Sequence, residues 1–244
     1  MDTLIQAHKL VRQHIGQALE PVLLDTYEAC RETEKRPYEW TPADVGQRAL
    51  KNTVLSYLVA GNPQHHLKRL SEQLARRHNM TDSRAAMSML GDYADAATFR
   101  TAMDAFSQHY LNNPQVLEQW FREQAAADHD KVLERVQELM HHPVYDSQNP
   151  NMIRALLEEF AWNPTHFHRK DGAGYQFVAD QVIAIDAFNP SIAASLAKAF
   201  SKINQFDPDR QALMKKQLQR IQRETHSPDV QDIVDKTLKS LDAK

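Results

Sequence analysis

Apolar residues recur along this chain with the spacing of an α-helix. Tyr175, Val178, Val182 and Ile185 lie three or four residues apart, which places them on one helical face. No Asn-Gly or Asp-Gly turn separates two alternating apolar runs, as a short β-hairpin would require. The pattern therefore predicts an all-α protein. Similar stripes occur at Leu50, Val54 and Tyr57, at Val132, Val136 and Leu139, at Ile153, Leu156, Leu157 and Phe160, and at Met214, Leu218 and Ile221.

Prolines predict where many of these helices begin. A short polar residue followed by proline supplies a capping oxygen and then a residue whose fixed φ suits the first helical position. At Thr41-Pro42, Asp44 adds a negative charge that complements the helix dipole. The spacing of the starts predicts about a dozen helices, and two successive helices approach the length of a HEAT-like repeat. The chain length allows one large domain or two closely packed halves. The eight starts follow Thr41, Asn62, Asn113, Asn149, Asn163, Asn189, Asp207 and Ser227.

Composition narrows the function classes. The 244 residues are 42% hydrophobic and 25% charged, which is typical of a soluble globular chain. A net charge of −3 offers no positive field for nucleic acid, and no membrane partner is expected. None of the six glycines is spaced as in a dinucleotide fold or a P-loop. Cys30 is the sole cysteine and the amino terminus does not resemble a signal peptide, so we expect a cytoplasmic protein without disulfides.

Catalytic motifs are missing from the chain. None of its 12 histidines is followed by glutamate, so the H-E-x-x-H motif of zinc peptidases is absent, and so is a G-x-S-x-G nucleophile elbow. The adjacent pairs His65-His66 and His141-His142 would point about 100° apart on a helix, which disfavours a shared ion. His166 and His168 could join Asp171 around a metal, but a loop between helices is the favoured explanation. We expect no catalytic residue and no metal ligand here.

A helical metal-dependent phosphohydrolase is a weaker alternative. Such enzymes combine a His-Asp pair with an earlier histidine and a later aspartate, and His129-Asp130, His109 and Asp186 could fill these places. However, Asp128 or Asp130 also precedes the stripe that begins at Val132, and an acid there is explained by helix capping. The phosphohydrolase hypothesis therefore requires these side chains to converge on one ion.

Arg154 is the residue that composition and spacing leave as a binding candidate. It lies one turn into the helix that carries Ile153 and Leu156 on its apolar stripe, and so borders the buried face. An arginine in that place can pack its stem and present a planar fork to a carboxylate. The carboxylate can belong to a neighbouring helix or to a ligand, and the residues alone favour a structural salt bridge.

Several segments resemble one known family over nearly the whole chain. The match is to the carboxy-terminal helical domain of bacterial aminopeptidase N, a gluzincin-type zinc alanyl aminopeptidase of the M1 family. The matching segments are Asn149-Pro150-Asn151-Met152-Ile153-Arg154-Ala155-Leu156, Phe167-His168, Asp171 to Phe177, Lys51-Asn52-Thr53, Asn79 to Asp82, Asn189-Pro190, and Phe206 to Met214.

The resemblance implies a single all-helical domain over residues 1–244, a superhelical array of antiparallel helix pairs like a HEAT or ARM α-solenoid. It also implies a part of an enzyme that is inactive alone. In the family this domain closes over the catalytic domain of the same polypeptide and restricts access of peptides to an internal chamber. Zinc is held by the catalytic domain, so this chain is expected to hold no cofactor. Arg154 matches an arginine that faces substrate, whereas Ser191 and Ser195 stand where the family often has polar and basic chamber residues, which weakens the case for a two-arginine clamp.

Two further expectations complete the interpretation. His168, Asp171, Gly172 and Gly174 are expected to form a structural loop before the next helix, with glycine allowing a tight turn. The alternative to an enzyme domain is a free-standing helical-repeat scaffold that binds a protein partner. The amino acid that such an aminopeptidase prefers cannot be deduced, because the selecting pocket is outside this chain.

Overall fold

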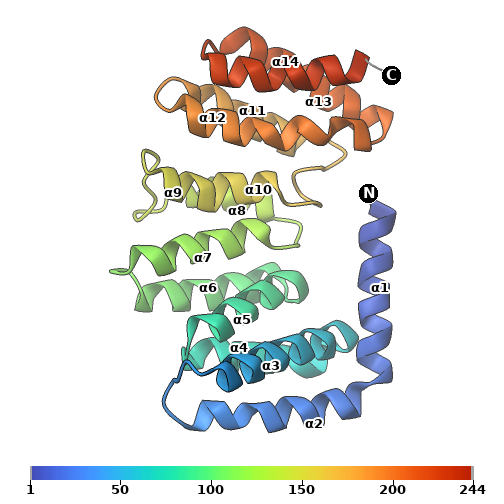
Figure 1. Ribbon diagram of the computed structural model, residues 1–244, viewed down its shortest axis with the longest axis vertical. Helices are drawn as coiled ribbons and strands as arrows, with labels where there is room; N and C mark the ends of the chain where they lie inside the picture. The colour runs from blue at the N-terminus through green and yellow to red at the C-terminus, as the bar shows by residue number, and fades with distance from the viewer. Residues whose placement is uncertain (1, 243–244) are drawn as a thin grey trace. The chain divides into compact units, whose positions relative to one another are not determined.

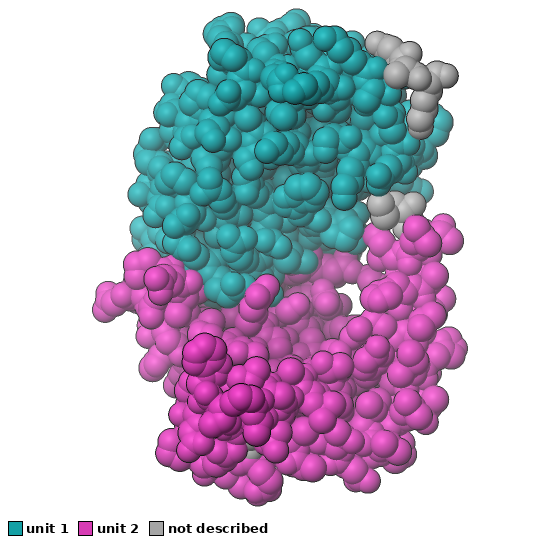
Figure 2. Space-filling model, in the orientation of Figure 1, with its two compact units in different colours: residues 1, 118–126, 130–244 teal, residues 2–117, 127–129 magenta. Residues whose placement is uncertain are grey.

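The computed structural model describes residues 2–242, and every regular element within them is helical (Figure 1). The all-α prediction is confirmed. The chain divides into two compact units (Figure 2), which we call the amino-terminal unit, residues 2–117 and 127–129, and the carboxy-terminal unit, residues 118–126 and 130–244. The division falls inside α7 (Pro114–Ala126).

The amino-terminal unit is organised around one long helix, α3, which contacts α1, α2, α4 and α5. Close packing against α1 depends on two glycines. A Cβ at Gly16 would collide with the carbonyl oxygen of Tyr57, and one at Gly61 would collide with the backbone of Gly16. The helices of this unit are α1 (Asp2–Ala18), α2 (Glu20–Cys30), the 3₁₀ helix η1 (Arg31–Lys35), α3 (Pro42–Gly61), α4 (Pro63–Arg76), α5 (Met80–Tyr93) and α6 (Ala96–His109).

The carboxy-terminal unit packs its helices around an aromatic centre. The buried Phe167 ring meets Tyr175 at 5.1 Å and Phe200 at 5.5 Å between centroids, both edge to face, which is a favourable geometry. Helix α11 contacts α12 and α13, and α14 contacts α12 and α13. Besides most of α7, the elements are α8 (Val132–Leu139), α9 (Pro150–Ile153), η2 (Arg154–Glu158), α10 (Glu159–Ala161), α11 (Ala173–Asp186), α12 (Pro190–Ala197), the 3₁₀ helix η3 (Lys198–Gln205), α13 (Pro208–Glu224) and α14 (Pro228–Asp242).

Seven of the eight proline-based helix starts are confirmed, at α3, α4, α7, α9, α12, α13 and α14. At α3, Thr41 Oγ1 accepts the Asp44 N–H at 3.2 Å, as the capping pattern predicts. The start at Asn163-Pro164 is wrong. Asn163 Oδ1 accepts the N–H groups of Thr165 at 3.1 Å and His166 at 2.9 Å, which closes a turn without continuing into a helix.

The predicted stripes are buried where they belong to internal helices. Tyr175, Val178, Val182 and Ile185 are all buried, as are the three stripe residues of α8. Leu50 departs from its stripe, because 48% of it is exposed on α3. Among the described residues, no helix is long and apolar enough to cross a lipid bilayer.

Candidate functional site

Arg154 opens a π-helical turn within a continuous helical segment made of α9, η2 and α10. Asn149 starts the segment by accepting the N–H of Asn151 at 2.9 Å. At the other end, the N–H of Glu159 donates to the carbonyl of Arg154, five residues back rather than four. Single π turns inside α-helices are uncommon, but those that occur are often found at functional sites. A π turn changes the direction in which side chains leave the helix.

The side chain of Arg154 is half-buried, and its stem lies beside the buried Ile153 and Ala155. Within residues 2–242, no hydrogen bond or ion pair engages its guanidinium. The structural salt bridge that the residues alone favoured is therefore not formed with a described residue. Guanidinium carries five N–H donors in a rigid fork, which suits a carboxylate or carbonyl oxygen. Its donors remain available to a ligand.

Two other charged residues of this unit, Arg122 and Glu158, can be compared with Arg154. Arg122 Nη1 donates to Glu159 Oε2 at 3.0 Å, so the arginine beside this segment has a partner within the unit. Glu158 closes the π turn with a buried Oε1 that accepts no hydrogen bond from the described residues. An orphaned buried acceptor costs about 1–3 kcal/mol in a protein. Unpaired donors and an unpaired acceptor thus occupy one turn.

Helix α12 contacts η2 and carries Ser191 and Ser195, the serines singled out in the sequence. Ser191 is exposed and Ser195 is half-buried. Neither can supply the positive charge of an arginine, so any electrostatic attraction at this turn depends on Arg154.

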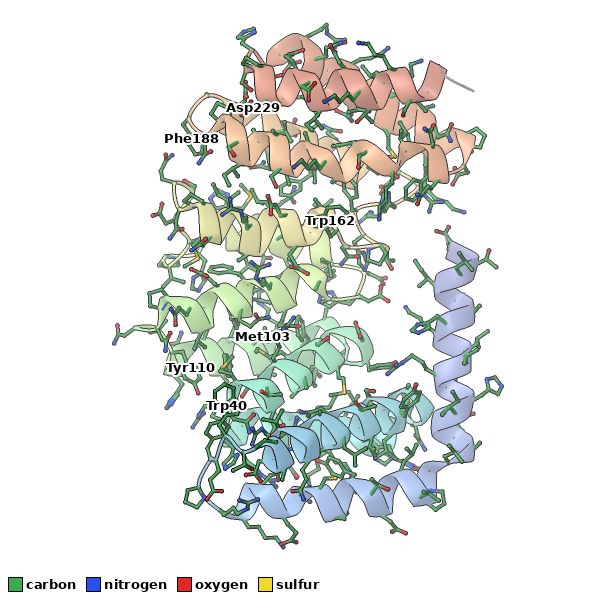
Figure 3. The ribbon with its side chains drawn as sticks, viewed as in Figure 1. Trp40, Met103, Tyr110, Trp162, Phe188 and Asp229 are labelled. Carbon is green, nitrogen blue, oxygen red and sulfur yellow. The ribbon has the colours of Figure 1, made fainter. Side chains whose placement is uncertain are left out.

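Two exposed aromatic residues of the carboxy-terminal unit escaped the sequence analysis. Trp162 follows α10 with 54% of its surface exposed, and Lys202 Nζ lies 5.7 Å from the centre of its ring (Figure 3). Phe188, between α11 and α12, is 44% exposed (Figure 3). Large exposed aromatic side chains are enriched at binding surfaces. The only available signal for Trp162 was its place just before the Asn163-Pro164 turn.

The loop before α11 is structural, as expected. Gly172 adopts φ +75°, and a Cβ at Gly174 would collide with the carbonyl oxygen of Phe167. His168 stacks on Phe206 at 3.9 Å between centroids, and its Nδ1 shares a 3.0 Å hydrogen bond with the Tyr175 hydroxyl. Asp171 pairs with Arg169 at 2.7 Å, which lowers the pKa of Asp171. These residues serve the loop and do not converge on a metal.

No group of three histidine, cysteine or acidic side chains within residues 2–242 is arranged to hold a metal ion. Two residues of the phosphohydrolase set, Asp186 and His129, have other contacts. Asp186 accepts the N–H groups of His226 at 3.1 Å and Ser227 at 3.3 Å at the start of α14, and the His129 ring meets Phe99 edge to face. The expected cap by Asp128 or Asp130 is wrong. Helix α8 follows Lys131 with no side-chain cap, and Asp128 pairs with Lys9.

Two segments that carried the family resemblance meet in a buried ion network of the amino-terminal unit. Lys51 Nζ donates to Asp82 Oδ2 and to Glu34 Oε1, both at 2.7 Å, and the lysine is fully buried. Asn52 and Asn79 donate to Asp82 at 2.8 and 2.9 Å. The network joins α3, α5 and η1. The network gives the two segments a role in stability, because a buried charge must be paired.

The comparison with known families decides what the chain is. The DUF3458_C family, described as a domain of unknown function with ARM repeats, matches residues 1–239. The chain belongs to this family. Its α-solenoid class is therefore confirmed, since ARM repeats are stacked helical units.

Relatives of this DUF3458_C domain are named aminopeptidase N. The protein of Haemophilus influenzae is 32% identical over 239 residues, which are 97% of this chain and 27% of that protein. The protein of Caulobacter vibrioides is 36% identical over 180 residues, which are 73% of this chain and 21% of that protein. The DUF3458_C domain thus spans about a quarter of their length and corresponds to the carboxy-terminal domain of aminopeptidase N-like proteins.

A solved structure gives the same result. Legionella pneumophila aminopeptidase A, crystallised in complex with aspartic acid, is 30% identical to the DUF3458_C domain and superposes with a TM-score of 0.86. The likeness covers 98% of this chain and 29% of the Legionella chain. The fold of the described residues is therefore that of one part of a larger aminopeptidase.

Proposed function

We propose that residues 1–244 act as one non-catalytic domain of a zinc-dependent aminopeptidase, which encloses the active-site chamber and restricts entry to peptides. The parent enzyme releases amino-terminal residues from short peptides in the cytoplasm, and its zinc lies in the catalytic domain of the same polypeptide. Residues 2–242 contain no group of three side chains arranged to hold zinc, and the role proposed for this domain is binding and shape. A single, buried cysteine, Cys30, accords with a reducing compartment.

The proposal for the site rests on the unpaired guanidinium of Arg154. A half-buried arginine has lost part of its hydration, and no described residue compensates. A peptide supplies the missing partner, either its terminal carboxylate or a carbonyl oxygen beyond the bond that is cut. By fixing that part of the peptide, Arg154 would place the scissile bond in the catalytic domain.

An exposed apolar stripe on α1 supports docking on the rest of the polypeptide. Leu4 is 71% exposed, Val11 58% and Ile15 36%, at positions four and seven residues apart. Such spacing makes a continuous apolar edge on a helix. Exposed apolar edges on soluble proteins mark interaction surfaces. Because the relatives are about four times longer than this chain, we assign this edge to the remainder of the parent polypeptide.

Kinetics of the full-length enzyme test the role of Arg154. We expect Arg154→Ala to raise KM about tenfold or more for peptides of three or more residues, because a charge-assisted hydrogen bond is lost. Small aminoacyl chromogenic substrates, which end before this contact, should be unaffected. Arg154→Lys should restore only part of the effect, since lysine lacks the planar fork. Arg223→Ala, at an exposed position of α13, is the matched control. Equal effects on both substrate classes would exclude the role.

The alternative function, a free-standing scaffold, differs in the size of the native polypeptide. An immunoblot of source cells with an antibody against this chain should detect a protein several times larger than 28.0 kDa. Zinc-dependent aminopeptidase activity should co-purify with that band. A band at the mass of the chain itself would favour the scaffold instead.

A further inference from the structure

A cavity of about 520 Å³, open to solvent and lined largely by exposed residues, lies along α4 and α6 of the amino-terminal unit. Its volume is within the range of roughly 300–1,000 Å³ that small-molecule sites occupy. It is formed within that unit and shares no residue with the turn that carries Arg154. A ligand there would be independent of the proposed peptide contact.

The wall of the cavity is apolar and made of small residues. Helix α6 contributes Ala97, Ala102 and Ala105, whereas Leu74 comes from α4. Phe106 adds a buried ring to the lining. Such a surface favours an aliphatic or aromatic body and gains little from a strongly hydrated one.

The hydroxyl groups of the lining donate internally. Thr98 Oγ1 donates to Asp95 at 2.6 Å, and Thr101 Oγ1 donates to the carbonyl of Ala97 at 2.9 Å. Asp95 also accepts the N–H groups of Ala97 and Thr98, so the positive end of α6 is already occupied by a carboxylate. An anionic ligand must find its donor elsewhere.

Arg77 is that donor and the one charged residue of the lining. It ends α4 with φ 50°, the only positive φ of a non-glycine residue among those described. Its guanidinium makes no ion pair or hydrogen bond with a described residue, whereas the preceding Arg76 pairs with Glu34. A single fork-shaped cation at the edge of an apolar cavity complements one carboxylate.

We infer that this cavity binds small molecules that combine an apolar body with a single carboxylate, such as medium-chain carboxylic acids. The alanine surface takes the apolar chain and Arg77 takes the carboxylate. Amines are disfavoured, since no acidic side chain lines the cavity to balance their charge. Short hydrophilic acids are disfavoured because they leave the apolar wall uncovered.

Binding of octanoate to this chain tests the inference. Methyl NMR of alanine-labelled protein should show saturable shifts of the Ala97, Ala102 and Ala105 methyl groups, and calorimetry should give the affinity. Octylamine and acetate should each bind about tenfold more weakly or not at all, because one lacks the negative charge and the other the chain. Octanoate that shifts none of these methyl groups would overturn the inference.

Two substitutions separate the two halves of the proposed site. Arg77→Gln should weaken octanoate about tenfold, and Ala102→Leu should abolish binding by filling the cavity. Lys68→Gln, at an exposed position of α4 outside the lining, should change nothing. Circular dichroism verifies that each variant is folded. If Ala102→Leu unfolds the protein, Arg77→Gln decides alone. Unchanged octanoate affinity in Arg77→Gln, or equal binding of octylamine, would show that the cavity is only an apolar recess.

Discussion

Replacing Lys51 by methionine tests whether the buried ion network holds the amino-terminal unit together. The lysine side chain is 0% exposed, and its two partners, Glu34 and Asp82, are 6% and 4% exposed. Methionine fills nearly the same space without the charge. The substitution therefore removes the ammonium group while leaving both carboxylates in an environment with little water.

The expected loss follows from the contacts that remain. Removing one partner of a buried ion pair typically costs about 3–5 kcal/mol, because the other charge is left uncompensated. Here Asp82 keeps its hydrogen bonds from Asn52 and Asn79, and Glu34 keeps its ion pairs with two arginines. We therefore expect the lower end of the range, about 3 kcal/mol. That is a large part of the roughly 5–15 kcal/mol by which domains are stable.

Urea unfolding, combined with hydrogen exchange, measures the effect. Lys51→Met should lower the unfolding midpoint by about 1 M or more, and faster exchange should be concentrated in α3, α4 and α5. Lys35→Met is the control, because Lys35 is 70% exposed and its pair with Glu32 should contribute under about 1 kcal/mol. Adding Asp82→Asn to Lys51→Met should cost less than the sum of the two single changes. A Lys51→Met variant within about 0.5 kcal/mol of the wild type would refute the argument.

Two further predictions concern packing and pH. Gly16→Ala should destabilise the amino-terminal unit by about 2 kcal/mol, because its Cβ would collide with the backbone of Tyr57. Gly46→Ala, at an exposed position of α3, has nothing within 4 Å of the added Cβ and should stabilise by about 0.5–1 kcal/mol, so the two variants should shift thermal unfolding in opposite directions. Arg210 holds the pKa of Asp207 at about 2, below its ordinary 3.8. That stabilisation is complete above about pH 4 and is lost as the pH falls toward 2. In Asp207→Asn, the urea midpoint should therefore change less with pH across this window than in the wild type.

The helices could be predicted well from the sequence because their starts depend on hydrogen bonds between residues that are close in the chain. Thr41, Asn113, Asn149 and Asn189 each accept an N–H from the first turn of the helix that follows. Asn163-Pro164 is also an Asn-Pro dipeptide, but it forms a turn and does not begin a helix. Its side-chain amide also donates to the carbonyl of Ala125 at 3.1 Å, a contact distant in sequence that holds the turn. Local patterns cannot contain such a contact.

The site was only partly predictable for the same reason. Arg154 could be singled out from its place beside an apolar stripe, but the π turn depends on how the whole segment packs, and no sequence signal announced it. The ion network could be predicted even less. Lys51 lies 17 residues from Glu34 and 31 residues from Asp82 along the chain, and only the fold brings the three together. Conversely, Asp186 looked like a metal ligand until its hydrogen bonds to the start of α14 were known.

The contrast between Lys51 and Arg154 bears on function. The chain buries a lysine completely and surrounds it with carboxylates, so its fold is able to pair charges wherever stability requires it. In the carboxy-terminal unit, Arg122 and Arg220 have acidic partners, at 3.0 and 2.5 Å. Arg154 is half-buried in the same unit and has none among the described residues. A partly desolvated guanidinium without a partner lowers stability and gains most from an incoming carboxylate. That gain is realised only in a complex, which is the behaviour expected of a substrate-binding residue.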